Sequence, residues 1–220
     1  MTKRGVFVTG TDTGVGKTFV AACLAQAWGC DYWKPVQTGL GDEPEGDSET
    51  IARLAAGPRG TLYAPRFSLQ ASLSPAAAAA LEGVRIAMYD FGIPEADGAE
   101  TNERPLIVEG AGGVLVPLTC DHLMIDLIAQ LKLAVVVVAR STLGTINHTL
   151  LTLEALRARR LPVAGVILNG PPNSGNRTAI ERFGKVRVIA ELPRLETAPD
   201  AAAIAALAAT HIPSLEWVLS

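Results

Sequence analysis

The chain has 220 residues, of which 49% are hydrophobic, 5% aromatic and 19% charged. A chain this apolar can bury enough surface to offset its conformational entropy, which excludes an intrinsically disordered protein. The 19 basic and 22 acidic residues leave a formal net charge of −3, which argues against a broad nucleic-acid-binding surface. We therefore expect one compact domain over residues 1–220.

Neither a membrane span nor a secretion signal is predicted. The longest aliphatic run covers residues 133–139, whereas a membrane-spanning helix needs about 20 apolar residues. The apolar stretch after the basic first residues ends at Thr9, which is too early for a signal-peptide core. Cys23, Cys30 and Cys120 are odd in number and have no C-x-x-C spacing, so we expect reduced thiols and a cytoplasmic protein.

Short aliphatic runs alternate along the chain with longer helix-like segments. The runs are too short for buried helices, and we predict strands at residues 5–9, 32–36, 106–109, 134–139, 164–168 and 186–190. The helix-like segments cover residues 17–28, 48–56, 125–131, 145–160 and 200–209. This alternation is typical of an α/β fold with a parallel sheet that helices cover on both faces.

Two further segments lie between these elements. Ser74 and Pro75 precede an alanine run, which predicts a helix with serine at the N-cap and proline at the first helical position. Residues 88–104 contain glycine, proline and several acids, and we expect them to be mostly loop.

A glycine-rich turn connects the first predicted strand to the first predicted helix. Residues 10–18 have the sequence G-T-D-T-G-V-G-K-T. Such a turn directs consecutive backbone N–H groups at one position, and the helix N-terminus adds positive potential there. Lys17 can reach the β- and γ-phosphates of a nucleotide, and the Thr18 hydroxyl can bind Mg²⁺. The spacing has one residue more than the standard pattern, but we interpret the turn as a phosphate-binding P-loop.

The same glycines also begin a dinucleotide-binding pattern, which we reject. Phe19 occupies the position of the third glycine, and no acidic residue ends the second predicted strand at the expected offset.

A P-loop commonly works with an acidic residue at the end of a neighbouring strand. Glu109 follows a hydrophobic run and precedes glycines that allow a close approach to a ligand. Asp47 is a weaker candidate from the residues alone, because other acids surround it on what we expect to be a solvated loop.

Five segments resemble dethiobiotin synthetase. They are residues 10–18, W-K-P-V at 33–36, V-E-G-A-G-G at 108–113, L-G-T-I-N-H at 143–148 and G-V-I-L-N at 165–169. Their order and spacing extend from Lys3 to Pro193, and the combination is more specific than a P-loop alone. The resemblance implies a single-domain P-loop NTPase-like fold with helices on both faces of a parallel sheet.

The resemblance also implies a reaction. An ATP- and Mg²⁺-dependent ligase of this family forms the ureido ring of dethiobiotin from 7,8-diaminopelargonate and CO₂. The diamine first forms a carbamate, which attacks the γ-phosphoryl group and becomes a carbamic-phosphoric anhydride. The second amine then closes the ring by expelling phosphate.

The roles of individual residues follow from the same resemblance. Lys34 would be the catalytic lysine beside the carbamate, and Lys17 would stabilise charge on the transferred phosphoryl group. The metal ligands would be Thr18, Asp47 and Glu109. The nucleotide would contact Thr13, Gly14, Val15, Gly16, Lys17, Thr18, Phe19, Asp47, Glu109, Gly110, Ala111, Gly112, Asn169, Gly170, Pro193, Arg194 and Leu195. Of these, Asn169, Pro193, Arg194 and Leu195 would contact the base, although turn formation before Gly170 is a nearly equal explanation for Asn169.

The substrate would be held by two chains of a homodimer. The resemblance implies a hydroxyl contact from Thr38, and a carboxylate site that the neighbouring subunit supplies through Gly144, Thr145, Ile146 and Asn147. From the residues alone, the latter turn is a helix start that can bind an anion, but a self-satisfied cap without a ligand is the favoured interpretation. The residues alone also favour a surface lysine at position 34 and a packing histidine, not a catalyst, at position 148.

The main alternative is a nucleotide switch of the partition-ATPase type that acts through a protein partner. Such switches carry a second lysine in a K-G-G-x-G-K-[ST] pattern, and Asp12 occupies its place here. Amidotransferase-type cobyrinate synthetases need a glutaminase domain for which 220 residues leave no room. We expect small-molecule substrates and a second copy of the chain as partners, with neither nucleic acid nor membrane.

Overall fold

The computed structural model describes residues 4–42, 45–55, 60–95, 104–195 and 197–220. Its main sheet has seven strands in the order β4-β2-β6-β1-β7-β8-β9, and all their pairings are parallel. Strand β1 (Gly5–Gly10) lies between β6 (Leu106–Gly113) and β7 (Ala134–Arg140). The predicted α/β fold with a parallel sheet is confirmed.

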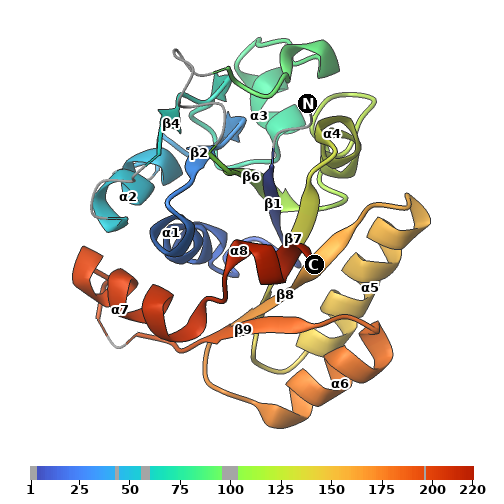
Figure 1. The fold of residues 1–220 in the computed structure, drawn as a ribbon. Coiled ribbons are helices and arrows are strands. Elements are labelled where there is room, and N and C mark those ends of the chain that lie inside the picture. The colour runs from blue at the N-terminus through green and yellow to red at the C-terminus, as the bar shows by residue number, and fades with distance from the viewer. Residues whose placement is uncertain (1–3, 43–44, 56–59, 96–103, 196) are drawn as a thin grey trace.

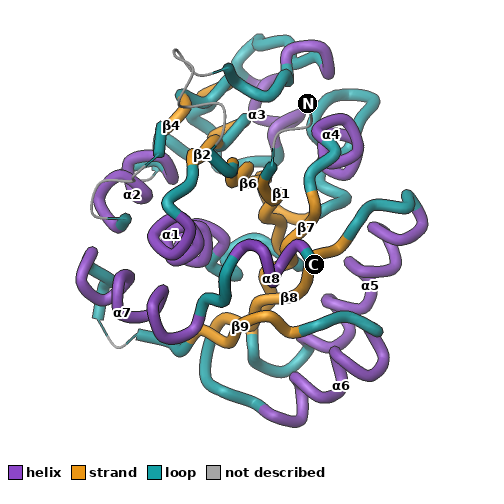
Figure 2. The backbone as a smooth tube through the Cα atoms, in the orientation of Figure 1, coloured by secondary structure: helices purple, strands orange, loops and turns teal. Residues whose placement is uncertain are grey.

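Helices cover both faces of the sheet (Figure 1). One face carries α1 (Lys17–Trp28), α2 (Asp47–Leu54), α7 (Ala201–His211) and α8 (Leu215–Leu219). The other carries α3 (Pro75–Leu81), α4 (Met124–Leu131), α5 (Thr145–Ala158) and α6 (Ser174–Gly184). Figure 2 shows the orange strands as one layer between these helices.

The two faces explain why the central strands are apolar along their whole length. In β7, Val135 and Val137 pack into the core under α4 and α5, whereas Val136 and Val138 pack into the core under α1. Successive side chains of a strand point to opposite faces, so a strand buried on both sides needs apolar residues at every position. The high fraction of hydrophobic residues in the chain is therefore explained by a sheet that is buried on both faces.

The second predicted strand, residues 32–36, is wrong as a continuous element. Strand β2 (Asp31–Trp33) ends before Lys34, and β3 (Val36–Gln37) pairs with β5 (Phe67–Ser68) in a separate two-stranded sheet. Proline has no backbone N–H to donate and is therefore excluded from the interior of a sheet. The interruption leaves Lys34 at the carboxyl end of β2.

Other predicted boundaries differ from the structure by a few residues. The last strand is β9 (Val188–Leu192) rather than 186–190, and the strand before it is β8 (Val163–Asn169). Helix α2 begins one residue earlier than predicted, and residue 56 of that prediction lies outside the described residues. Asp200 is the N-cap of α7, accepting a hydrogen bond from the Ala203 N–H over 2.8 Å.

Four elements were not predicted: α6, α8, β5 and the edge strand β4 (Leu62–Tyr63). The sequence of α6 is polar, and only Ile180 and Gly184 of it are buried, so it has little hydrophobic periodicity. Strands of two residues are too short to show a period. The predicted cap at Ser74 is confirmed, since its side chain accepts a hydrogen bond from the Ala77 N–H.

The segment expected to be loop contains a short 3₁₀ helix (Met88–Asp90). Residues 91–95 and 104 have no helix or strand, and residues 96–103 lie outside the described residues. None of the helices in the described part of the chain has the length and hydrophobicity that a membrane crossing needs.

Candidate active site

The glycine-rich loop between β1 and α1 forms the centre of the candidate site. Gly14 and Gly16 have φ angles of 71° and 90°, in the left-handed region that favours glycine. A Cβ atom at Gly16 would lie 2.2 Å from Nδ2 of Asn169, so a side chain at this position would have to displace the Asn169 amide group. Helix α1 begins at Lys17 without a side-chain cap or an acidic residue in its first turn. Its N-terminus is therefore suited to an anion.

The side chain of Lys17 is buried beside this loop. Within the described residues its one hydrogen bond is to the Asp12 carbonyl, over 3.4 Å. Burial and the positive charge of Lys34 lower the pKa of Lys17, although the carboxylates of Glu109 and Asp47 oppose this effect. An anion in the loop would stabilise the ammonium group, so the electrostatics favour phosphate binding next to Lys17.

A buried cluster of charged side chains lies at the carboxyl ends of β2 and β6. Nζ of Lys34 donates to Oε1 of Glu109 over 3.1 Å and forms an ion pair with Asp47. The side chain of Lys34 is 5% exposed and that of Glu109 is fully buried. Burial alone would lower the pKa of Lys34, but the two carboxylates raise it above its ordinary value. Lys34 therefore stays protonated in the folded protein.

Asp47 is also held in its charged form. Burial would raise its pKa, but the charge of Lys34 and hydrogen bonds from Lys34 and Thr18 lower it below the ordinary value. Its backbone N–H donates to Oε1 of Gln37 over 3.1 Å. The expectation of a solvated loop is wrong at this position, because Asp47 begins α2 and that helix packs against α1.

Three side-chain oxygens meet at Thr18. Its Oγ1 lies 2.7 Å from Oδ1 of Asp47 and 2.9 Å from Oε1 of Glu109. A hydroxyl has one hydrogen and can donate to only one of these carboxylates at a time. Oxygen ligands of this kind are the ones that Mg²⁺ prefers, and it usually takes only one or two carboxylates alongside phosphate and water. The donor set therefore fits magnesium.

The described residues contain no group of three or more His, Cys, Asp and Glu side chains that could hold a metal. A magnesium ion at Thr18 would therefore depend on the hydroxyl and on phosphate oxygens as well as on the two carboxylates. The cluster also corrects the interpretation of Lys34 as a surface lysine, because β2 ends inside the protein.

The residues predicted to contact the nucleotide base lie at the ends of β8 and β9. Nδ2 of Asn169 donates to the Val15 carbonyl over 2.9 Å, and the Gly170 N–H donates to the Leu192 carbonyl over 2.9 Å. Gly170 and Pro193 line a cavity of about 330 Å³ along the free edge of β9. Arg194 and Leu195 follow directly after Pro193. Contact of these residues with a base stays a prediction.

Among the described residues, the two predicted substrate contacts make no hydrogen bond with the charged side chains of the cluster. Thr38 follows β3 and is half-buried, and its carbonyl accepts a hydrogen bond from Nε2 of Gln37 over 2.9 Å. Residues 144–147 begin α5, which packs against α6 and β7. In the described residues, no hydrogen bond joins them to Lys34 or Glu109. Their role in substrate binding stays a prediction.

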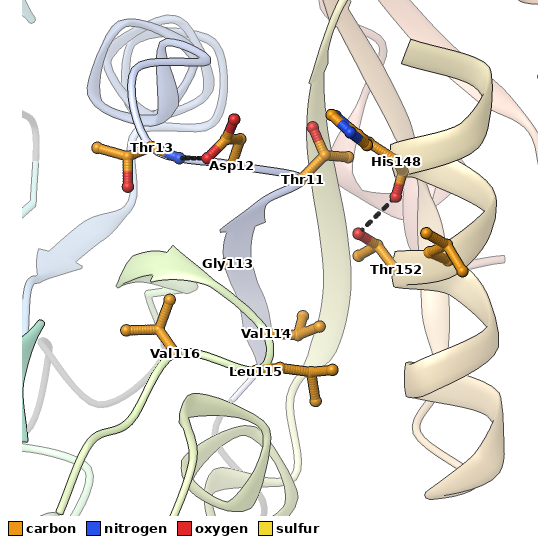
Figure 3. Close-up of a pocket in the computed structure, with 10 residues that line it drawn as sticks. Thr11, Asp12, Thr13, Gly113, Val114, Leu115, Val116, His148 and Thr152 are labelled. Atoms are coloured by element: carbon orange, nitrogen blue, oxygen red, sulfur yellow. Dashed lines mark hydrogen bonds between the residues drawn. The ribbon is translucent and has the colours of Figure 1, made fainter. Parts of the chain in front are cut away.

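A pocket of about 360 Å³ lies beside the P-loop (Figure 3). Its walls are the loop at 11–13, the turn at 113–116 after β6, and His148, Leu151 and Thr152 of α5. The expectation that His148 packs in the core is wrong, because its side chain is exposed and faces this pocket. Leu151, on the next turn of α5, is also exposed beside the pocket.

Sequence reasoning missed two polar contacts of the site. The phenol of Tyr32 donates to Oε2 of Glu109 over 3.0 Å, and Arg140 donates to Oδ2 of Asp12 over 2.7 Å. Tyr32 precedes Lys34 by two residues, so strand alternation places both side chains on the same face. That spacing was the available signal for Tyr32. Arg140 has no comparable signal, because its contact depends on the pairing of β7 with β1.

Comparisons with known proteins identify the fold and the family of the chain. The profile of the AAA_26 family, described as an AAA domain, matches residues 4–201. A solved ParA family ATPase from Chlorobium tepidum TLS superposes with a TM-score of 0.51 over 100% of this chain and 99% of that chain. Its sequence identity is 11%, so the likeness shows a shared fold alone.

Curated relatives are much closer in sequence. The biotin biosynthesis bifunctional protein BioCD of Bordetella avium is 55% identical over 99% of this chain, which spans 45% of that longer protein. The ATP-dependent dethiobiotin synthetase BioD of Paramagnetospirillum magneticum is 55% identical over 93% of this chain and 94% of its own. BioD of Rhodopseudomonas palustris strain HaA2 is 47% identical over 91% of each. The chain therefore belongs to the ATP-dependent dethiobiotin synthetase family.

Proposed function

We propose that this ATP-dependent ligase of biotin biosynthesis performs its chemistry at the cluster of Thr18, Lys34, Asp47 and Glu109. The observation that carries the proposal is the buried ammonium group of Lys34, which two carboxylates hold next to the first turn of the P-loop helix. Its substrates would be 7,8-diaminopelargonate, CO₂ and ATP. The use of ATP accords with the predicted cytoplasmic location.

The charges of the substrates explain the need for two lysines. A carbamate and a triphosphate are both anions, and they repel each other unless fixed cations lie between them. Lys17 would support the charge on the transferred phosphoryl group, and Lys34 would face the carbamate. Because its pKa is raised, Lys34 would donate hydrogen bonds rather than remove a proton.

The reaction itself has two covalent steps after carbamate formation. A carbamate oxygen bonds to the γ-phosphorus as the bond to ADP breaks. The second amine then bonds to the carbonyl carbon, loses a proton and expels phosphate. Lys34 would hold the carbamate in line for the first step and would stabilise the developing negative charge in both.

Thr18, Asp47 and Glu109 would bind Mg²⁺ in this proposal. When bound, the ion would neutralise charge on the β- and γ-phosphates. Asp47 would remain charged at neutral pH, since its pKa is lowered. Glu109 is held in place by hydrogen bonds from Lys34 and Tyr32.

The aliphatic chain of the diamine would lie in the pocket beside the P-loop. Val114, Leu115, Val116 and Leu151 supply an apolar wall, and Thr11 and Thr13 supply hydroxyl groups at the loop. Such a lining suits a molecule with a polar end and an aliphatic chain. The Thr38 hydroxyl would contact the reacting end of the substrate.

We also propose a homodimer with shared active sites. The turn at residues 144–147 would hold the substrate carboxylate of the neighbouring subunit. The helix N-terminus supplies positive potential for a carboxylate. The adjacent Leu143 is 99% exposed, which suits a contact with another chain. Light scattering at several protein concentrations would measure the mass, and a monomer at all of them would contradict this part of the proposal.

The test of the reaction is mass spectrometry of the product formed from 7,8-diaminopelargonate, bicarbonate, Mg²⁺ and ATP. We expect the mass of dethiobiotin, and recovery of unreacted diamine would contradict the proposal. ATP hydrolysis should require both diamine and bicarbonate. Hydrolysis stimulated instead by DNA or a protein partner would favour the partition-type switch. The shared fold is the one observation that supports this alternative.

A further inference from the structure

The two oxygens of the Glu109 carboxylate have separate environments. Oε1 faces Thr18 and Lys34, at 2.9 and 3.1 Å, whereas Oε2 accepts a hydrogen bond from the phenol of Tyr32 over 3.0 Å. One oxygen therefore belongs to the charged cluster, and the other is engaged by a neutral donor on the adjacent strand.

The position of Tyr32 follows from the pairing of β2 with β6. Tyr32 lies opposite Ile107, and Trp33 lies opposite Val108, so the strand order places β2 directly beside Glu109. The phenol reaches along the sheet from the level of Ile107 to that of Glu109, two residues further on. Tyr32 has no exposed surface, and water does not compete for its hydroxyl.

The phenol has a fixed acceptor at this position, because its side chain is fully buried and its hydroxyl lies 3.0 Å from Oε2 of Glu109. If the Glu109 carboxylate turned out of this orientation, either the Tyr32 hydroxyl or the donor groups of Thr18 and Lys34 would lose their acceptor.

We propose that Tyr32 is a positioning residue that holds Glu109 with a single oxygen, Oε1, towards the metal, and that it thereby favours Mg²⁺ over Ca²⁺. Mg²⁺ requires six ligands in near-ideal octahedral geometry, whereas Ca²⁺ is larger and often binds both oxygens of one carboxylate. While Oε2 is hydrogen-bonded to Tyr32, Glu109 offers one oxygen. This inference rests on the proposed role of Glu109 as a metal ligand.

The experiment removes the hydroxyl and measures metal binding directly. Tyr32→Phe keeps the ring, and Tyr63→Phe is the matched control. Tyr63 lies on the neighbouring strand β4, and its hydroxyl faces Oδ2 of Asp31 at 3.5 Å, away from Glu109. Mn²⁺ bound to the full chain with a non-hydrolysable ATP analogue would be followed by electron paramagnetic resonance, and Mg²⁺ and Ca²⁺ would compete for it.

In Tyr32→Phe we expect the affinity for Mg²⁺ to fall about tenfold, as it does when an outer-sphere partner of a ligand is lost. The affinity for Ca²⁺ should stay the same or rise, so that the preference for Mg²⁺ decreases. Tyr63→Phe should leave both affinities unchanged. An unaltered Mg²⁺-to-Ca²⁺ ratio in Tyr32→Phe would overturn the inference, as would equal losses for both ions.

Glu109→Gln separates this inference from the proposed function. If that variant binds Mn²⁺ as well as the unaltered chain, Glu109 is not a ligand and the proposed metal site fails. If it loses Mn²⁺ while Tyr32→Phe keeps the full preference for Mg²⁺, only the role of Tyr32 fails. Should Tyr32→Phe not fold, Tyr32→Met, which also lacks a hydroxyl, would take its place in the same measurements.

Discussion

Two regions at the carboxyl edge of the sheet, on opposite sides of the P-loop, are built in different ways. On the β2–β6 side, charged side chains contact one another in the interior, and Lys34 is 5% exposed. On the β8–β9 side, Asn169 and Gly170 use an amide group and a backbone N–H to contact backbone carbonyls. The charged pair there, Arg177 and Glu191, is 45% and 23% exposed.

The difference between the two regions fits the function proposed for each of them. Charges that develop during phosphoryl transfer are stabilised most by fixed charges in a buried environment, where the effective dielectric constant is low. Recognition of a planar, uncharged base needs shape and a few hydrogen bonds, which tolerate nearby water. We therefore expect changes in the first region to affect the turnover rate, and changes in the second to affect nucleotide affinity.

The largest expected effect is that of Lys34→Ala. It should lower turnover by about 1,000-fold, because it removes the cation that faces the developing charge. It also leaves the buried carboxylate of Glu109 and the partly buried carboxylate of Asp47 without their ion-pair partner, so the free energy of unfolding should fall by roughly 3 kcal/mol. Phosphate release and urea unfolding would measure the two effects, and ATP binding should stay within about threefold of the unaltered chain.

The exposed Lys185 provides the control for this experiment, and Lys185→Ala should leave turnover unchanged. Turnover of Lys34→Ala at the level of the unaltered chain would remove Lys34 from the proposed catalytic residues.

The next largest effect should be that of Glu109→Gln. The amide keeps the shape of the side chain but loses its charge, and we expect turnover to fall about 100-fold at a fixed Mg²⁺ concentration. Part of the activity should return as Mg²⁺ is raised, because the ion is bound more weakly. A titration of activity against Mg²⁺ would measure this, and a loss that is the same at every concentration would argue against a ligand role.

Asn169→Ala tests the second region and should have a smaller effect of another kind. The loss of one or two hydrogen bonds corresponds to about a tenfold increase in KM for ATP. The kcat should stay within about twofold, since the charged cluster is unaltered. Steady-state kinetics with ATP and GTP would also show whether discrimination between the bases decreases. A fall in kcat without a change in KM would contradict the division between the two regions.

The smallest expected effect concerns stability at acid pH. Because the folded-state pKa of Asp47 is lowered, this carboxylate stabilises the fold above its unfolded pKa, near 4. The contribution is lost as the pH falls below that value through the folded pKa. Urea unfolding at pH 7, 5 and 3 should show about 1 kcal/mol less dependence on pH in Asp47→Asn than in the unaltered chain. Identical pH dependence would mean that the pair with Lys34 does not stabilise the fold.

Local patterns in the sequence were sufficient for much of the fold and for part of the site. The P-loop could be predicted because its glycines, lysine and threonine are consecutive and each has a local physical role. The parallel sheet could be predicted because strands buried on both faces need continuous apolar runs. Glu109 could be predicted as a site residue because it follows such a run directly.

Other features depend on segments that are distant in the sequence. The burial of Lys34 requires β2 to lie beside β6, and Lys34 and Glu109 are 75 residues apart. The acidic neighbours of Asp47 predict a solvated loop, but Asp47 begins α2, and the packing of α2 on α1 turns it inward. His148 has no local signal for its position beside the pocket.

The sequence by itself thus determined the class of fold, the phosphate-binding loop and the family, because each of these depends on residues that are close together or in a set order. The tertiary structure alone decided that Lys34 forms ion pairs with Asp47 and Glu109 in the interior, and that Tyr32 engages the second oxygen of Glu109. The physical reason is the order of the strands. Which strands lie side by side depends on the packing of both faces of the whole sheet, and no single segment encodes it.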